Sequence, residues 1–124
     1  MPSAADYAAK PVAATLHRLS ETPVELGRVV TASDDAPLSR RPEPASWSAK
    51  EIVCHLRDVE ELFQLRFHTI LALHEPMILV LGANSEELAH PERGRLTLAQ
   101  WAASLAGHDD NHLAQLARAL DGRA

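Results

Sequence analysis

The stretch TLAQWAASLAGHDDNHLAQLARAL, residues 97–120, combines a helix start, a long apolar stripe and two histidines four residues apart. Its first four residues form a capping-box pattern, in which Thr97 and Gln100 can bond the free amide groups at the start of a helix. Residues three or four apart then form one largely apolar stripe, which consists of Leu98, Ala102, Leu105, Asp109, Leu113, Leu116 and Leu120. This pattern predicts an amphipathic helix that packs against other helices.

Two earlier segments have the same helical period. The segment from about Ala4 to Thr31 contains Pro23, but its stripe keeps its phase across this proline, so one kinked helix is favoured over two helices in line. The other segment begins with the capping box Ser48–Glu51 and ends near His74. The two stripes are Val12, Leu16, Leu19, Pro23, Leu26 and Val30 in the first segment, and Ile52, Leu56, Val59, Phe63, Phe67 and Ile70 in the second.

The remaining segments have no clear helical period. Residues Ala32 to Ser46 contain three prolines and mixed charges, which indicates a loop. Trp47 follows it, in the position of a hydrophobic staple before a helix cap. The stretch Glu75 to Leu96 stays open: Met77–Leu81 is either a short helix or an extended strap.

The composition excludes several classes of protein. The chain has 124 residues, of which 46% are hydrophobic and only 4% aromatic, which favours one all-α domain over residues 1–124. A net charge of −5 without a basic stripe argues against nucleic-acid binding. No apolar run is long enough to span a membrane, the N-terminus does not have the pattern of a signal peptide, and Cys54 is the only cysteine. We therefore expect a cytoplasmic protein.

Three histidines are placed to meet between the helices. His108 and His112 are four residues apart, so a rotation of ~100° per residue puts them only about 40° apart on one helix face. His55 lies at the margin of the apolar face of the preceding predicted helix. Three imidazoles from facing helices can form a divalent metal site with one open position. A lone histidine at such a margin is more often an ordinary hydrogen-bonded residue, so the prediction depends on all three together.

Three nearby residues have weaker signals. Asp109 occupies the place of the glutamate in a zinc-protease helix, but it is shorter and is better interpreted as a residue that orients an imidazole, or as a polar residue at the bundle edge. Arg66 is a candidate for binding an anionic substrate, although a snorkelling or ion-paired side chain is the more common case. Cys54 points ~100° away from His55, which argues against a cysteine–histidine pair.

At these residues the chain resembles the DinB-like superfamily of four-helix-bundle proteins. The resemblance is carried by Arg41-Pro42 with WSAKEIVCHLRD (47–58), by GRLTL (94–98) and by HDDNHLAQL (108–116). It implies an up-down-down-up bundle in which His55, His108 and His112 bind zinc, nickel or iron. It further implies a metal-dependent thiol transferase, or a related hydrolase or isomerase, that uses mycothiol, bacillithiol or glutathione.

The chain departs from the family pattern in one place. Only Glu75 to Leu96 is available for the long crossover and third helix of the family, so we expect a truncated third helix. A shortened third helix leaves apolar surface uncovered, which predicts a homodimer. The alternative function is a non-catalytic helical dimer that binds a metal or a small ligand and has lost activity together with the third helix.

Overall fold

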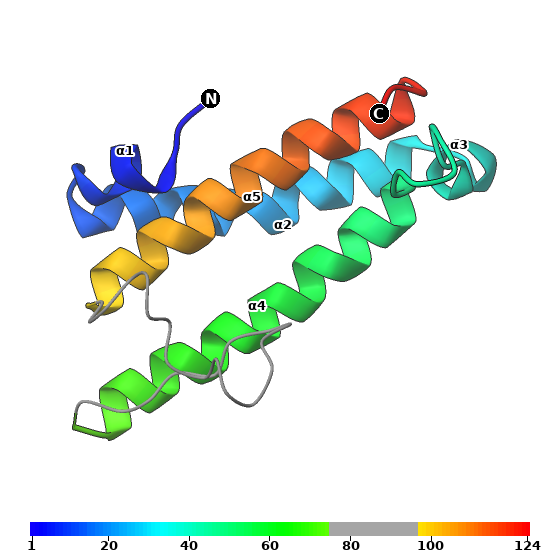
Figure 1. The fold of residues 1–124 in the computed structure, drawn as a ribbon. Coiled ribbons are helices and arrows are strands. Elements are labelled where there is room, and N and C mark those ends of the chain that lie inside the picture. The colour runs from blue at the N-terminus through cyan, green and yellow to red at the C-terminus, as the bar shows by residue number, and fades with distance from the viewer. Residues whose placement is uncertain (75–96) are drawn as a thin grey trace.

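The computed structural model describes residues 1–74 and 97–124, and its regular elements are all helices (Figure 1). They are α1 (Ala4–Ala8), α2 (Val12–Ala32), α3 (Asp35–Ser39), α4 (Ala49–Ala72) and α5 (Leu98–Leu120). This confirms the all-α class predicted from the composition. The expectations for Met77–Leu81 and for a truncated third helix fall on residues 75–96, which lie outside the described residues.

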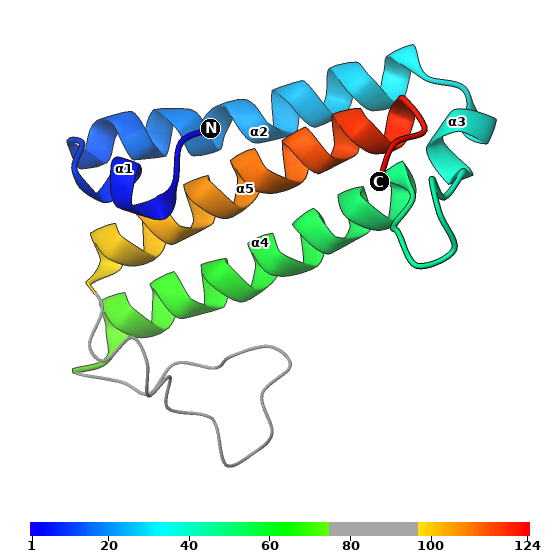
Figure 2. The same ribbon diagram turned by 45° about the horizontal axis from the view of Figure 1, so that its top comes forward.

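The last helix, α5, lies between α2 and α4 and also contacts α1 (Figure 2). Its predicted stripe is confirmed, because Ala102, Leu105, Asp109 and Leu116 are buried. It buries further residues outside this stripe, since it has neighbours on more than one side: Trp101, Ala103, Ala106 and Ala119. The start of α5 is also as predicted, with both hydrogen bonds of the Thr97–Gln100 capping box formed.

Helix α4 follows the sequence prediction closely. Ser48 is its N-cap, and both hydrogen bonds of the capping box with Glu51 are present. The first four residues of its predicted stripe are buried, and they divide between two apolar clusters against α5. Ile52 and Leu56 pack with Leu116 in one cluster, and Val59 and Phe63 pack with Trp101 and Leu105 in the other. Full burial of a side chain such as Ile52 contributes roughly 1.5–3 kcal/mol to folding.

The N-terminal segment breaks at Pro11, which corrects the predicted single helix from Ala4. Proline disfavours helical backbone at the residue before it, so α1 ends at Ala8 and the chain turns before Val12. The Ser3 capping box with Asp6 begins the short α1 separately. By contrast, α2 runs through Pro23 without ending, as the phase of the sequence pattern had predicted.

The buried face of α2 differs from the predicted stripe. Val12, Leu16 and Val30 are exposed, and Thr15 and Thr22 are buried instead. The sequence pattern misplaced this face because it counted apolar side chains only, whereas the interface with α5 includes polar groups such as the Thr22 hydroxyl.

The segment 32–46 is also not a simple loop, because it contains α3. Leu38 of this short helix is buried against Ala49 and Ile52 of α4 and closes one end of the core. No helix in the described ranges is long and apolar enough to cross a membrane.

Candidate metal centre

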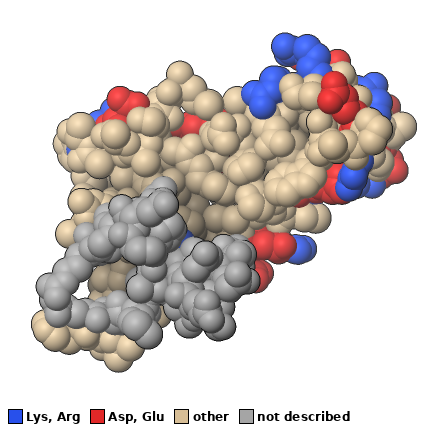
Figure 3. Space-filling model, in the orientation of Figure 1, with Lys and Arg blue, Asp and Glu red and all other residues tan. Residues whose placement is uncertain are grey.

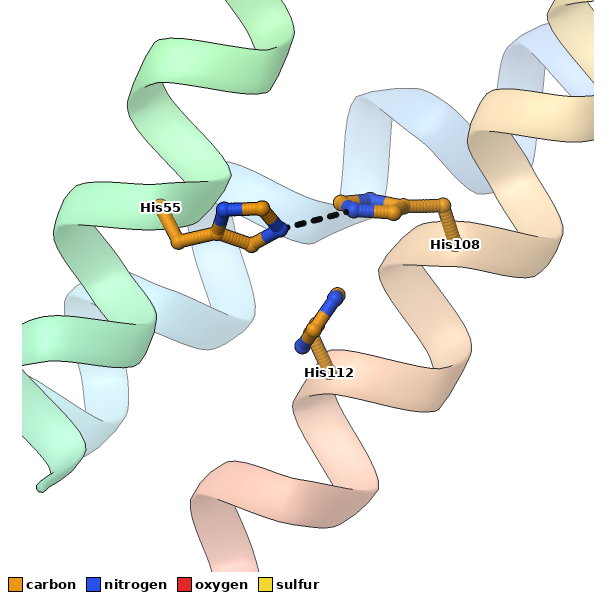
Figure 4. Close-up of side chains that lie close together, drawn as sticks. All are labelled: His55, His108 and His112. Carbon is orange, nitrogen blue, oxygen red and sulfur yellow. Dashed lines mark hydrogen bonds between the residues drawn. The ribbon is translucent and has the colours of Figure 1, made fainter. Parts of the chain in front are cut away.

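His55 from α4 meets His108 and His112 from α5 in the gap between these helices (Figure 4). Each histidine offers one ring nitrogen, and the three nitrogens all lie within 4.8 Å of one another. The Nε2 atoms of His55 and His108 are 3.1 Å apart. The three residues that the sequence predicted as metal ligands are therefore brought together by the fold.

This spacing is compatible with a metal ion. Imidazole nitrogens bind zinc at ~2.0–2.1 Å in a tetrahedral arrangement, which separates two bound nitrogens by about 3.3 Å. The Nε2 atoms of His55 and His108 are already close to that separation. All three side chains are partly rather than fully buried. The donor set suits zinc, nickel or iron, which imidazole nitrogens commonly bind.

The ring of His112 is held in the form that a metal requires. Its Nδ1 lies 2.8 Å from the side-chain oxygen of Gln115, one turn further along α5. An amide oxygen can only accept, so Nδ1 donates and Nε2 is left with its lone pair. Sequence reasoning quoted Gln115 within a family motif but gave it no role. The geometry identifies it as the residue that fixes the tautomer of His112.

Asp109 stands behind His108 and links it to α2. Its Oδ2 accepts a hydrogen bond of 2.8 Å from the Thr22 hydroxyl, and its Oδ1 lies 3.6 Å from Nδ1 of His108. Within the described part of the chain, this Nδ1 is buried and has no hydrogen-bond partner. A small rotation of either side chain would let Nδ1 donate to the carboxylate, which would leave Nε2 of His108 free to bind a metal.

Burial is the main cause that lowers the pKa of both His55 and His112 below the usual value, and a positive charge on His108 would lower both further. For His112 the hydrogen bond to Gln115 acts in the opposite direction. Neutral imidazole is the form that binds a metal. The lowered pKa values of His55 and His112 therefore favour metal binding over protonation at these two rings.

Trp47, which the sequence placed as a hydrophobic staple, also lies against this histidine cluster. Its indole lies 4.9 Å from the ring of His55 and stacks at 6.3 Å on the ring of His112, measured between ring centroids. It belongs to none of the apolar clusters of the described residues. The sequence signal was available, because Trp47 precedes His55 by about two helical turns, but the staple pattern accounted for it first.

A second group that sequence reasoning missed surrounds Asp110. The Tyr7 hydroxyl donates to Oδ2 of Asp110, and Nε and Nη2 of Arg18 each lie 2.7 Å from Oδ1. Burial and the neighbouring Asp110 raise the pKa of Tyr7 to about 12. These contacts fasten α1 and α2 to α5 beside the histidine pair.

The other candidate residues lie apart from the cluster. Cys54 is exposed, in agreement with the predicted helix phase. Arg66 is buried and stands 4.7 Å above the rings of both Phe63 and Trp101, eleven residues beyond His55, or about 16 Å at ~1.5 Å per residue. The structure therefore does not bring Arg66 to the centre. His17, His68 and His74 are exposed and also lie outside it.

The chain was compared with protein-family models, curated proteins and solved structures. No protein-family model matches the chain, and no curated protein and no solved structure matches it significantly.

Proposed function

We propose that this protein binds one divalent metal ion, zinc, nickel or iron, through Nε2 of His55, His108 and His112. The observation that carries the proposal is the convergence of three partly buried imidazoles within 4.8 Å. The hydrogen bond from His112 to Gln115 supports it, because that bond leaves the correct nitrogen free. When bound, the metal would supply Lewis acidity at an open fourth position.

The proposed reaction class is transfer of a thiol, with a small cosubstrate such as mycothiol, bacillithiol or glutathione. The support is the likeness of the WSAKEIVCHLRD and HDDNHLAQL elements to the DinB-like superfamily, together with a neutral three-nitrogen donor set. With neutral ligands the centre keeps the full positive charge of a divalent ion, which favours a thiolate over a neutral thiol. The role of the chain is then to hold three neutral rings and to leave one side open.

We further propose that the chain forms a homodimer of DinB-like bundles with a shortened third helix. Two long helices support this, because Val12 and Leu16 of α2 and Leu65 and Leu71 of α4 are about half exposed or more. On the face drawn in Figure 3, charged side chains gather near α3 and the C-terminus, and the middle is largely uncharged. A non-catalytic dimer that binds a metal or a small ligand is the alternative, and such a protein would bind the ion without activating a thiol.

Calorimetric titration of zinc into metal-stripped protein tests the metal site. We expect one site per chain in the wild type, strong weakening in His55→Ala, and no change in the exposed control His17→Ala. The transferase would be supported if metal-loaded protein consumes a thiol together with a small electrophile. His55→Ala should then consume neither the thiol nor the electrophile. Metal binding without any thiol consumption would favour the non-catalytic alternative.

A further inference from the structure

The indole of Trp47 is an aromatic surface that the core does not use. It contacts two of the three histidine rings, at 4.9 Å from His55 and 6.3 Å from His112, and 39% of the residue is still exposed. The other tryptophan, Trp101, is only 6% exposed and packs with Phe63 and Leu105. Exposure of a large apolar side chain beside a cluster of ligating groups is typical of a binding site rather than of a core.

The position of Trp47 is fixed relative to the histidines. It immediately precedes Ser48, whose capping box with Glu51 is complete, and Arg41 pairs with the same glutamate. The indole and His55 are therefore carried by one well-anchored end of α4. A ligand that approaches the histidine cluster on the side of the indole would therefore contact Trp47 together with His55 or His112.

The charge of the centre restricts what can lie there. Three neutral imidazoles leave a divalent ion with its full charge, so a cationic group is repelled and an anionic donor is attracted. An indole prefers flat or apolar groups, stacked or edge-on, at 4.5–7 Å between ring centroids. Both requirements are met by a thiolate that carries a flat group, such as an aromatic ring or a planar amide, close to its sulfur.

We propose that Trp47 forms an aromatic wall of the metal centre and favours thiol ligands that carry a flat group, such as an aromatic ring or a planar amide, close to the sulfur. This inference rests on the proposed metal site. Binding would need no oxidant or reductant, because the thiol would release its proton to solvent and its sulfur would become the fourth donor. Trp47 would contact the flat group of the ligand and not the sulfur.

Cobalt(II) provides the test, because its visible absorption reports both metal binding and a new sulfur ligand. Protein loaded with cobalt is titrated with phenylmethanethiol, which carries a ring, and with ethanethiol, which does not. In Trp47→Leu, which keeps apolar bulk but removes the flat ring system, we expect the affinity for phenylmethanethiol to fall about five-fold more than the affinity for ethanethiol. Trp47→Phe should restore most of the difference.

The control is Leu65→Ala, which removes an exposed apolar side chain from α4 ten residues beyond His55. It should leave both affinities unchanged. Equal weakening of both thiols in Trp47→Leu, or no weakening, would overturn the role of Trp47 while leaving the metal site intact. A wild-type protein that develops no cobalt absorption would overturn the proposed metal site itself, and the wall with it. Circular dichroism of each variant confirms that it is folded.

Discussion

The hydroxyl of Thr22 donates to Asp109 across the interface of α2 and α5, and the same carboxylate lies 3.6 Å from Nδ1 of His108. A buried carboxylate is costly unless it is hydrogen-bonded, so Thr22 stabilises Asp109 in this position. The first long helix, which supplies none of the three histidines, thereby supports the histidine cluster. This contact also explains why Thr22 occupies the buried face of α2, where the sequence predicted apolar residues.

Replacing Asp109 with asparagine should weaken zinc binding by about 10- to 100-fold, because Nδ1 of His108 loses the nearby carboxylate to which it could donate when Nε2 binds the metal. Thr22→Val should act in the same direction but less strongly, through Asp109. Calorimetric titration with zinc measures both variants. The matched control is Thr31→Val, an exposed threonine of the same helix. Unchanged zinc affinity in Asp109→Asn would show that the carboxylate does not support the centre.

The raised pKa of Tyr7 predicts that the stability of the folded protein falls at alkaline pH. Its pKa is raised from 10.0 to about 12 in the folded protein, chiefly by burial and then by Asp110. Because the folded pKa lies above the unfolded one, the contribution of Tyr7 to stability is complete below pH 10 and is lost as the pH rises towards 12. Tyr7 is the only tyrosine, so ultraviolet titration of tyrosinate reads it directly. Ionisation near pH 10 in the folded protein would contradict the contact with Asp110.

Gly107 should be required for α1 to pack on α5. A Cβ atom at this position would lie 2.7 Å from the backbone nitrogen of Ala4, closer than side chains tolerate. We expect Gly107→Ala to destabilise the protein by about 1–3 kcal/mol in urea unfolding, or to detach α1. In the second case the pKa of Tyr7 should return towards 10.0. Gly27→Ala, where a Cβ meets nothing within 4 Å, is the control and should be neutral or slightly stabilising.

The exposed apolar residues of α2 and α4 predict a homodimer. Light scattering on the purified protein at micromolar concentration should give the mass of two chains. Leu16→Lys, which places a charge on the exposed side of α2, should shift this equilibrium towards the monomer. A wild-type protein that is monomeric and unfolds cooperatively would contradict the dimer.

The sequence predicted some helices more accurately than others. In α4 and α5 it predicted the caps and the buried stripes, because each capping box is local and each stripe is almost purely apolar. In α2 it misplaced the buried face, since the polar contact of Thr22 with Asp109 depends on two residues far apart in the chain. The sequence pattern did not predict the break at Pro11, because the apolar stripe begins only at Val12 and the one proline within it is Pro23.

The histidine cluster could be predicted because His108 and His112 share one helix at a spacing of four and His55 lies at the margin of another apolar face. The residues that surround the cluster could not be predicted in the same way. Thr22 supports His108 only through Asp109, and this contact depends on the packing of α2 against α5, which no local pattern encodes. Gln115 is one turn from His112, and Trp47 is about two turns from His55, but the sequence pattern did not show that their side chains meet the rings. Arg66 had a plausible helical phase but lies too far along α4 to join them.

The central claim is tested most directly by elemental analysis of protein purified without a histidine tag. We predict about one divalent metal ion per chain in the wild type and almost none in His112→Ala, because two imidazoles alone bind too weakly to survive purification. The exposed variants His68→Ala and Cys54→Ser should retain the wild-type content. Equal metal content in His112→Ala and wild type, or no metal in wild type even after incubation with zinc, would contradict a three-histidine metal centre.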